Sequence, residues 1–248
     1  MNKREKLSYV HNNSKEIKSE YKEQWESFKG FAFRYPDTCL QMDGIVKPEI
    51  WTGQRLKIMT FLKDSYRTDM KDYVSAFVLN LCNSDLTKYK DKREISTWWN
   101  VFKWVNAIRE SLGEEKESSL RSIAHMNVSK MACNGKESVY TRAGALEEAI
   151  EEDVDLLYAQ YKAIAPNIVI CGNTFSYFSK VLQYGEGEVV EKIIFKEPIE
   201  GKRPLYCYEV NGVLVFAAYH PSVLRTKPSD YKLIIDKHQE EIRKILGL

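Results

Sequence analysis

Four short apolar runs of the sequence each end in residues that could do acid–base or hydrogen-bond chemistry. The runs cover residues 56–62, 123–128, 167–171 and 213–218. The polar or turn residues at their ends are Asp64, Asn127, Gly172, Asn173 and His220. In open α/β sheets, ligands bind beyond the carboxyl ends of the strands. If the four runs are neighbouring strands, a carboxylate, an amide, a helix N-terminus and an imidazole can meet at one edge.

Each of these residues also has a purely structural interpretation. Asp64 could cap a turn or a helix, because short carboxylates accept hydrogen bonds from nearby backbone N–H groups. Asn127 could bracket two strands, and His220 could be a hydrogen-bonded loop residue. Taken together, four polar strand ends in one sheet favour a site over four separate structural roles.

The pattern of elements indicates an α/β fold. Apolar runs of strand length alternate with segments of helical periodicity, which are expected at residues 13–29, 71–82, 96–112, 141–165 and after residue 174. Residues 190–212 predict an antiparallel hairpin insertion, with a turn at Asn211-Gly212. The sequence therefore predicts one domain over residues 1–248. We expect a three-layer α/β/α sandwich around a central four-stranded parallel sheet, with the N-terminal helix packed outside.

Composition excludes several classes of protein. The chain has 248 residues, 44% of them hydrophobic, which is enough to bury a core without disulfides. Its five cysteines form no C-x-x-C pair, so no zinc or iron–sulfur site is expected. The sequence shows no signal peptide and no apolar run of membrane-spanning length. We therefore expect a cytoplasmic protein without cofactors.

The net charge of +2 allows nucleic-acid binding only through a local basic patch. The candidates for that patch are Lys63, Lys130, Arg225 and Lys227, which lie close to the polar strand ends in the sequence. Acidic side chains crowd residues 147–155 on one side of a predicted helix. We interpret them as a solvated face that is turned away from the site.

The motifs at the strand ends resemble those of the uracil-DNA glycosylase superfamily. Its first motif is similar to G-Q-D-P-Y, of which residues 63–66 (K-D-S-Y) keep the D-x-Y part. Its late H-P-S motif is matched by residues 220–224 (H-P-S-V-L). Between them, Asn127 resembles the asparagine presented by a family strand, and residues 170–174 resemble the glycine turn into a helix. The order of all four is the same, and the resemblance spans about residues 56–224.

The resemblance implies a glycosylase that hydrolyses the N-glycosidic bond of a flipped-out uracil or related damaged base. Asp64 would stabilise the sugar cation and orient water, and His220 would donate a hydrogen bond to the leaving base. The substrate-binding residues would be Asn127 on the base edge, Tyr66 at C5 and Phe77 as the stacking aromatic. The implied DNA contacts are Lys63, Ser65, Gly172, Asn173, Ser222, Leu224 and Arg225, with Leu224 as the wedge that fills the gap left by the base.

The sequence departs from the family pattern at several positions of these motifs. Leu62 replaces the opening glycine of the first motif, Lys63 its glutamine and Ser65 its proline. Arg225 replaces the last serine of the late motif. Two other functions stay open: a catalytically silent family member that binds nucleic acid or a nucleotide in the same cleft, and an unrelated small-molecule enzyme. The expected partner is DNA, duplex or single-stranded, bound by a monomer with no membrane contact.

Overall fold

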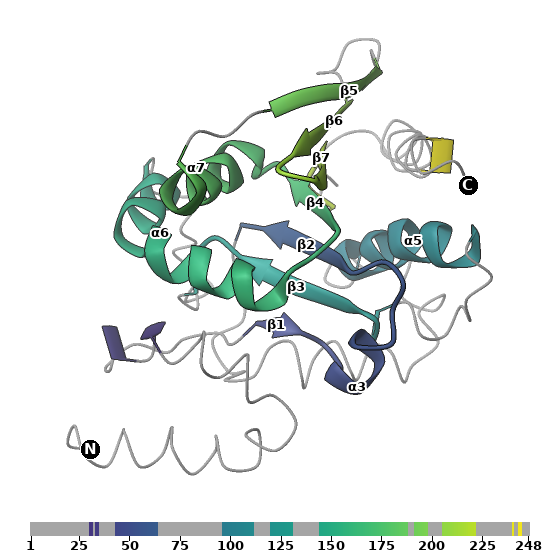
Figure 1. The fold of residues 1–248 in the computed structure, drawn as a ribbon, viewed down its shortest axis with the longest axis horizontal. Helices are drawn as coiled ribbons and strands as arrows, with labels where there is room; N and C mark the ends of the chain where they lie inside the picture. Colours follow the sequence, from purple (N-terminus) through teal and green to yellow (C-terminus); the bar gives the residue numbers. More distant parts are fainter. Residues whose placement is uncertain are drawn as a thin grey trace.

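The computed structural model describes residues 30–31, 33–34, 43–63, 96–111, 120–130, 144–187, 191–197, 205–221, 240 and 243–244. The strands are β1 (Gly44–Ile45), β2 (Ile58–Leu62), β3 (Ile123–Asn127), β4 (Ile168–Gly172), β5 (Glu191–Glu197), β6 (Leu205–Val210) and β7 (Val213–Ala218). The helices are α3 (Pro48–Trp51), α5 (Ser96–Ser111), α6 (Ala145–Ile164) and α7 (Phe175–Glu186). Figure 1 shows one sheet with helices packed around it.

The strands form a single mixed sheet in the order β1-β3-β2-β4-β7-β6-β5. Its centre, β3-β2-β4-β7, is parallel throughout, with Leu62 opposite Asn127 and Gly172 opposite Ala218 at the carboxyl ends. The prediction that the four apolar runs join one parallel sheet is confirmed. Their burial explains the sequence pattern, because parallel strands covered on both faces are continuously apolar.

The sheet is larger than the predicted four strands, since antiparallel strands extend it at both edges. At one edge β1 pairs with β3, and at the other β6 and β5 continue from β7. The predicted insertion is therefore part of the central sheet. Asn211 and Gly212 both have positive φ, of 50° and 80°, which makes the tight β6–β7 turn that the sequence predicted.

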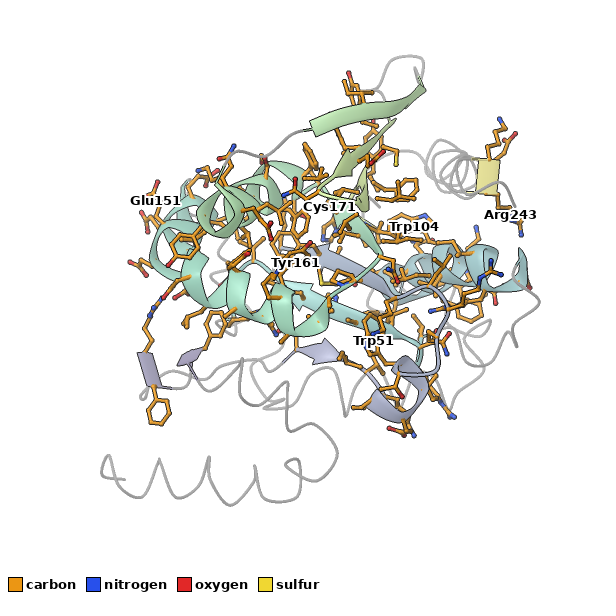
Figure 2. The ribbon with its side chains drawn as sticks, viewed as in Figure 1. Trp51, Trp104, Glu151, Tyr161, Cys171 and Arg243 are labelled. Carbon is orange, nitrogen blue, oxygen red and sulfur yellow. The ribbon has the colours of Figure 1, made fainter. Side chains whose placement is uncertain are left out.

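Helices cover both faces of the sheet, and each face has its own apolar core. On the α5 face, Trp98, Trp104 and Ile108 of α5 pack on Ile58 and Ile170 of the strands. The opposite face, the α6/α7 face, carries the buried sides of α6 and α7. Figure 2 shows Trp104 and Tyr161 extending from α5 and α6 into the space between helix and sheet.

Other predictions differ in their bounds or lie outside the described residues. The structure starts α6 at Ala145, where residue 141 was predicted, and ends it before Pro166 with Ala165 in the left-handed conformation. Residues 44–51, which carry no sustained hydrophobic period, contain β1 and α3. The predicted helices at 13–29 and 71–82 lie outside the described residues. Within the described ranges, no helix is long and apolar enough to cross a membrane.

Candidate functional site

The connections of the parallel strands diverge at the carboxyl ends of β2 and β4, and this part of the sheet edge is the candidate crevice. The chain leaves β2 toward β3 with α5 on one face, and it leaves β4 toward β7 with α7 on the other. Where neighbouring parallel strands send their connections in opposite directions, ligands bind outside the carboxyl ends of the strands. Lys63 and Asn173 follow these two strand ends directly. The described polar residues of the four strand ends thus lie at one edge of the sheet.

Close packing of the backbone explains Gly172 at the end of β4. A Cβ at this position would collide with the Leu62 side chain and come within 3.0 Å of Pro221 Cδ. The Gly172 backbone also lies beside His220, whose Cα would be 3.6 Å from that Cβ. The Leu62 side chain therefore occupies the space that Gly172 leaves open. The glycine brings the ends of β2, β4 and β7 together.

The turn from β4 into α7 is held by its own hydrogen bonds. Asn173 has a φ of 60°, and its N–H donates to Ala218 O at 2.9 Å. Thr174 does not cap the helix with its side chain; its hydroxyl donates to Phe61 O at 2.5 Å. Helix α7 begins at Phe175, so the predicted anion site would use the N–H groups that follow Thr174. Gly172 is buried in the strand, while the Asn173 side chain is exposed.

His220 is half-buried after β7 and is held beside the crevice by its neighbour Pro221. Asn100 of α5 donates from Nδ2 to Pro221 O at 2.9 Å, which ties this loop to the α5 face. Burial, together with the nearby Lys63 ammonium and the His125 ring, lowers the pKa of His220 to about 4. The imidazole is therefore neutral at pH 7. The effect of Lys63 and His125 on the His220 pKa also means that the ends of β2, β3 and β7 bring these three side chains within electrostatic reach of one another.

Asn127 is buried at the end of β3, with only 2% of its surface exposed. Strand alternation places its side chain on the α5 face together with His125. Its N–H donates to Asp43 Oδ2 at 2.6 Å, and its carbonyl accepts from Lys130 Nζ at 2.9 Å. Its side-chain Oδ1 meets no donor at hydrogen-bond geometry among the residues that the structure describes, although the Asn127 amide is close enough to the His125 ring to raise the pKa of that histidine. A buried amide oxygen without a partner is costly, and a ligand with an N–H group would satisfy it.

His125 lies two residues before Asn127 and is fully buried. Its Nδ1 shares a 2.8 Å hydrogen bond with Thr60 Oγ1, and the Trp98 ring meets its ring edge-on at 4.8 Å between centroids. Burial lowers the pKa of His125 to about 4, although the Asp43 carboxylate nearby acts in the opposite direction. A neutral imidazole therefore lines the α5 face beneath the crevice. Sequence reasoning missed His125, which only its alternation with Asn127 could have indicated.

A buried cluster of Asp43, Lys130 and Gln160 lies next to the Asn127 backbone, and its two charged members hydrogen-bond to that backbone. Lys130 Nζ lies 2.7 Å from both carboxylate oxygens of Asp43, and Gln160 Nε2 donates to Asp43 Oδ1 at 2.8 Å. Lys130 is 1% exposed. The prediction that Lys130 belongs to a basic DNA-binding patch is therefore wrong, because its charge is neutralised inside the protein. Asp43 and Gln160 carry no local sequence signal for this pairing.

The acidic side of α6 is closer to the site than predicted. Tyr177 donates from its hydroxyl to Glu147 Oε1 at 2.7 Å, and Glu147 lies within electrostatic reach of Lys180 and Lys63. The first turn of α6 therefore belongs to the rim of the crevice. Asp153, interpreted as part of the solvated face, is 3% exposed and pairs with Arg34 at 2.9 Å. Glu151 does follow the prediction: it is exposed and points outward from the helix (Figure 2).

The structure describes five of the predicted site residues, and it places Lys63, Asn127, Gly172, Asn173 and His220 at the same sheet edge. Several others lie outside the described residues: Asp64, Ser65, Tyr66, Phe77, Ser222, Leu224 and Arg225. Over the described ranges, no group of His, Cys, Asp and Glu is arranged to hold a metal ion. The sequence matches no protein-family model and no curated protein.

Proposed function

We propose that the protein is a DNA N-glycosylase of uracil-DNA glycosylase type, built on that family's three-layer sandwich. The observation that carries the proposal is that the buried Asn127 amide, whose Oδ1 meets no donor at hydrogen-bond geometry among the described residues, lies at the same sheet edge as the neutral His220. An amide side chain can accept from an imide N–H and donate to the adjacent carbonyl. This is the hydrogen-bond pattern of the uracil edge.

The proposed reaction breaks the bond between the anomeric carbon and the base nitrogen. The bonding electrons leave with the base as an anion, and the sugar develops positive charge. Water adds its oxygen to the anomeric carbon, and the proton that it loses passes to Asp64 or to solvent. Asp64, which follows Lys63 in the sequence, supplies the negative charge that stabilises this cation.

The low pKa of His220 suits the role of donor to the departing base. With a pKa of about 4, its ring carries one N–H at neutral pH and can direct it at the developing negative oxygen of the base. Because a site of this kind is preorganised, the hydrogen bond strengthens as charge develops and requires no change in protonation. We therefore expect a pH–rate profile without a step near pH 6.5, the ordinary pKa of histidine.

Lys63 favours a second candidate function, a silent member that binds nucleic acid without cleaving it. Its charge contributes to the low pKa of His220, so the ammonium group acts on the site itself. An ammonium group next to Asp64 can form an ion pair and reduce the negative charge available to the sugar cation. In this candidate, Lys63 serves as a phosphate contact and the crevice holds a base without reacting.

The test uses uracil-containing and hypoxanthine-containing oligonucleotides, followed by alkali cleavage of abasic sites. We expect wild-type cleavage, and a loss of several orders of magnitude in Asp64→Asn with DNA affinity nearly unchanged, because the carboxylate acts mainly in the transition state. Glu151→Gln, which removes an exposed carboxylate on α6, is the matched control and should cleave normally. Cleavage that appears only in Lys63→Gln would support the silent binder. If neither the wild-type protein nor Lys63→Gln cleaves any modified base, the enzyme assignment is wrong.

A further inference from the structure

The Asp43–Lys130 ion pair holds the backbone of Asn127 from both sides. Asp43 Oδ2 accepts the Asn127 N–H at 2.6 Å, and Lys130 Nζ donates to the Asn127 carbonyl at 2.9 Å. The two charged groups are 2.7 Å apart, with 0% and 1% of their side chains exposed. Both peptide groups of one residue are thus bound by the two members of one buried ion pair.

We propose that Asp43 and Lys130 are positioning residues that fix the Asn127 side chain in the crevice. The inference rests on the proposed function, in which Asn127 reads the edge of the base. A side chain that recognises a ligand must be held to within a fraction of an ångström, and its supporting shell does this. The pair therefore acts through Asn127 and does not touch the base.

The location of Asn127 explains why it needs such support. It is the last residue of β3 and extends past the end of β1, which pairs only Gly44 with His125 and Ile45 with Ala124. On the β1 side, therefore, no residue of the described strands hydrogen-bonds to the Asn127 backbone. Asp43, which precedes β1, replaces the missing ladder bond with its side chain. Gln160 of α6 in turn fixes Asp43 by donating to Oδ1 at 2.8 Å and to the Asp43 carbonyl at 3.2 Å.

Stability alone does not explain an ion pair at this position. Desolvating two charges costs several kcal/mol per ion, and well-packed apolar residues often replace a buried pair without loss. Burial lowers the pKa of Lys130, so the ammonium form depends on Asp43 to remain charged inside the protein. What an apolar pair could not supply is the acceptor for the Asn127 N–H and the donor for its carbonyl.

The first test measures the position of the Asn127 backbone without any use of activity. Protein labelled with ¹³C′-methionine and ¹⁵N-asparagine gives signals from only two peptides, Met1–Asn2 and Met126–Asn127, and Asn127→Asp identifies the second by its loss. A short hydrogen bond to a carboxylate moves the amide proton downfield. In Asp43→Asn we expect this resonance to return upfield. An unchanged resonance would show that Asp43 does not hold Asn127.

The second test measures kcat and KM on the uracil oligonucleotide. We expect kcat/KM to fall about a hundredfold in Asp43→Asn, the size of effect produced by a displacement of about 1 Å. The ratio of kcat/KM for uracil to kcat/KM for hypoxanthine should move closer to one as well. Val181→Ala, in the core of α7, is the control: it loses stability but does not touch Asn127, so it should keep both values at a temperature where it is folded. Equal losses in both variants would contradict positioning.

A third variant covers the case in which Asp43→Asn does not fold because Lys130 is left without its counter-ion. Asp43→Asn/Lys130→Met removes both charges, and we expect it to fold. Its Asn127 amide resonance should lie upfield of the wild-type position, and its kcat/KM should be low, as expected for Asp43→Asn. Wild-type kinetics in this folded variant would overturn the inference. If the wild-type protein cleaves no base, the proposed function fails. The resonance of Asn127 then still decides whether the ion pair holds it.

Discussion

The two faces of the sheet are built by the same strands, yet they bury different kinds of side chain. The strand residues on the α6/α7 face are apolar: Met59, Phe61, Ala124, Met126, Val169, Cys171 and Val215. On the α5 face the strands begin with apolar residues, and β2 and β3 then carry polar ones, Thr60, His125 and Asn127, at 0–2% exposure. On one face the strand residues therefore supply packing alone, and on the other they also supply groups that can meet a ligand.

This difference shows where the fold buries polar groups at a cost in stability. A buried polar group weakens a core unless hydrogen bonds replace its contacts with water. The α5 face meets that need for His125 through Thr60 but leaves Asn127 Oδ1 without a partner among the described residues. We expect substitutions of the apolar strand residues on the α6/α7 face to change stability alone. Substitutions of the polar strand residues on the α5 face should also change pH dependence and ligand binding.

The largest effect on stability should come from the apolar face. Phe61→Ala removes a fully buried ring that packs against Phe178 at 5.3 Å between centroids. Such truncations cost about 3–5 kcal/mol because they remove contacts and leave a cavity. Urea unfolding followed by fluorescence measures the change. Phe61→Leu, which keeps most of the volume, should cost much less, and equal losses in both variants would show that the cavity is not the source of the destabilisation.

The polar face should make stability depend on pH. The pKa of His125 is about 4 in the folded protein and 6.5 when unperturbed, so the unfolded chain binds more protons between these values. The stabilisation is fully present above pH 6.5 and is lost as pH falls toward 4, by about 3 kcal/mol at the limit. His220 acts in the same direction. Urea unfolding at pH 7 and pH 5 measures the loss, which should be smaller in His125→Gln. An equal loss in that variant would assign the effect elsewhere.

The central sheet could be predicted from the sequence because its signal is local. Strands buried on both faces are short and continuously apolar, and the four runs were bounded by turn residues. β1 could not be found this way, since two residues carry no period. The size of the sheet was underestimated for a related reason: the hairpin of β5 and β6 gave a clear turn signal, but nothing in it showed that β6 would pair with β7.

The site was predicted in part for the same reason. Residues that directly follow a recognisable strand, such as Asn127 and His220, are placed by that strand. Lys130 follows Asn127 equally closely, yet its partner Asp43 lies 87 residues away in the sequence. Whether a lysine is a surface charge or half of a buried pair depends on such distant contacts. Its local sequence did not distinguish the two.

A smaller effect should come from the hydrogen bond between Thr60 and His125. Thr60→Val keeps the shape of the side chain but leaves the His125 Nδ1 without its 2.8 Å partner in a fully buried position. An unsatisfied buried group costs about 1–3 kcal/mol, which thermal or urea unfolding at pH 7 can measure. Thr60→Ser keeps the hydroxyl and is the control. If Val and Ser variants are equally stable, the hydroxyl does not stabilise His125.

The smallest effect should come from the rim of the crevice, where the first turn of α6 carries negative charge toward Lys63. In Glu147→Gln the new amide oxygen can still accept the hydrogen bond from the Tyr177 hydroxyl. The substitution removes a carboxylate that lies within electrostatic reach of Lys63 and Lys180. Because Glu147 is exposed and screened, we expect DNA affinity to rise no more than about fivefold at low salt and to converge on the wild-type value at high salt. Glu151→Gln changes the net charge equally, one turn farther along the same helix, where the side chain points outward (Figure 2). A gain in Glu147→Gln that exceeds the gain in Glu151→Gln, measured by fluorescence anisotropy, would show that DNA passes over this rim. Equal gains would reduce the effect to net charge and remove the first turn of α6 from the proposed DNA path.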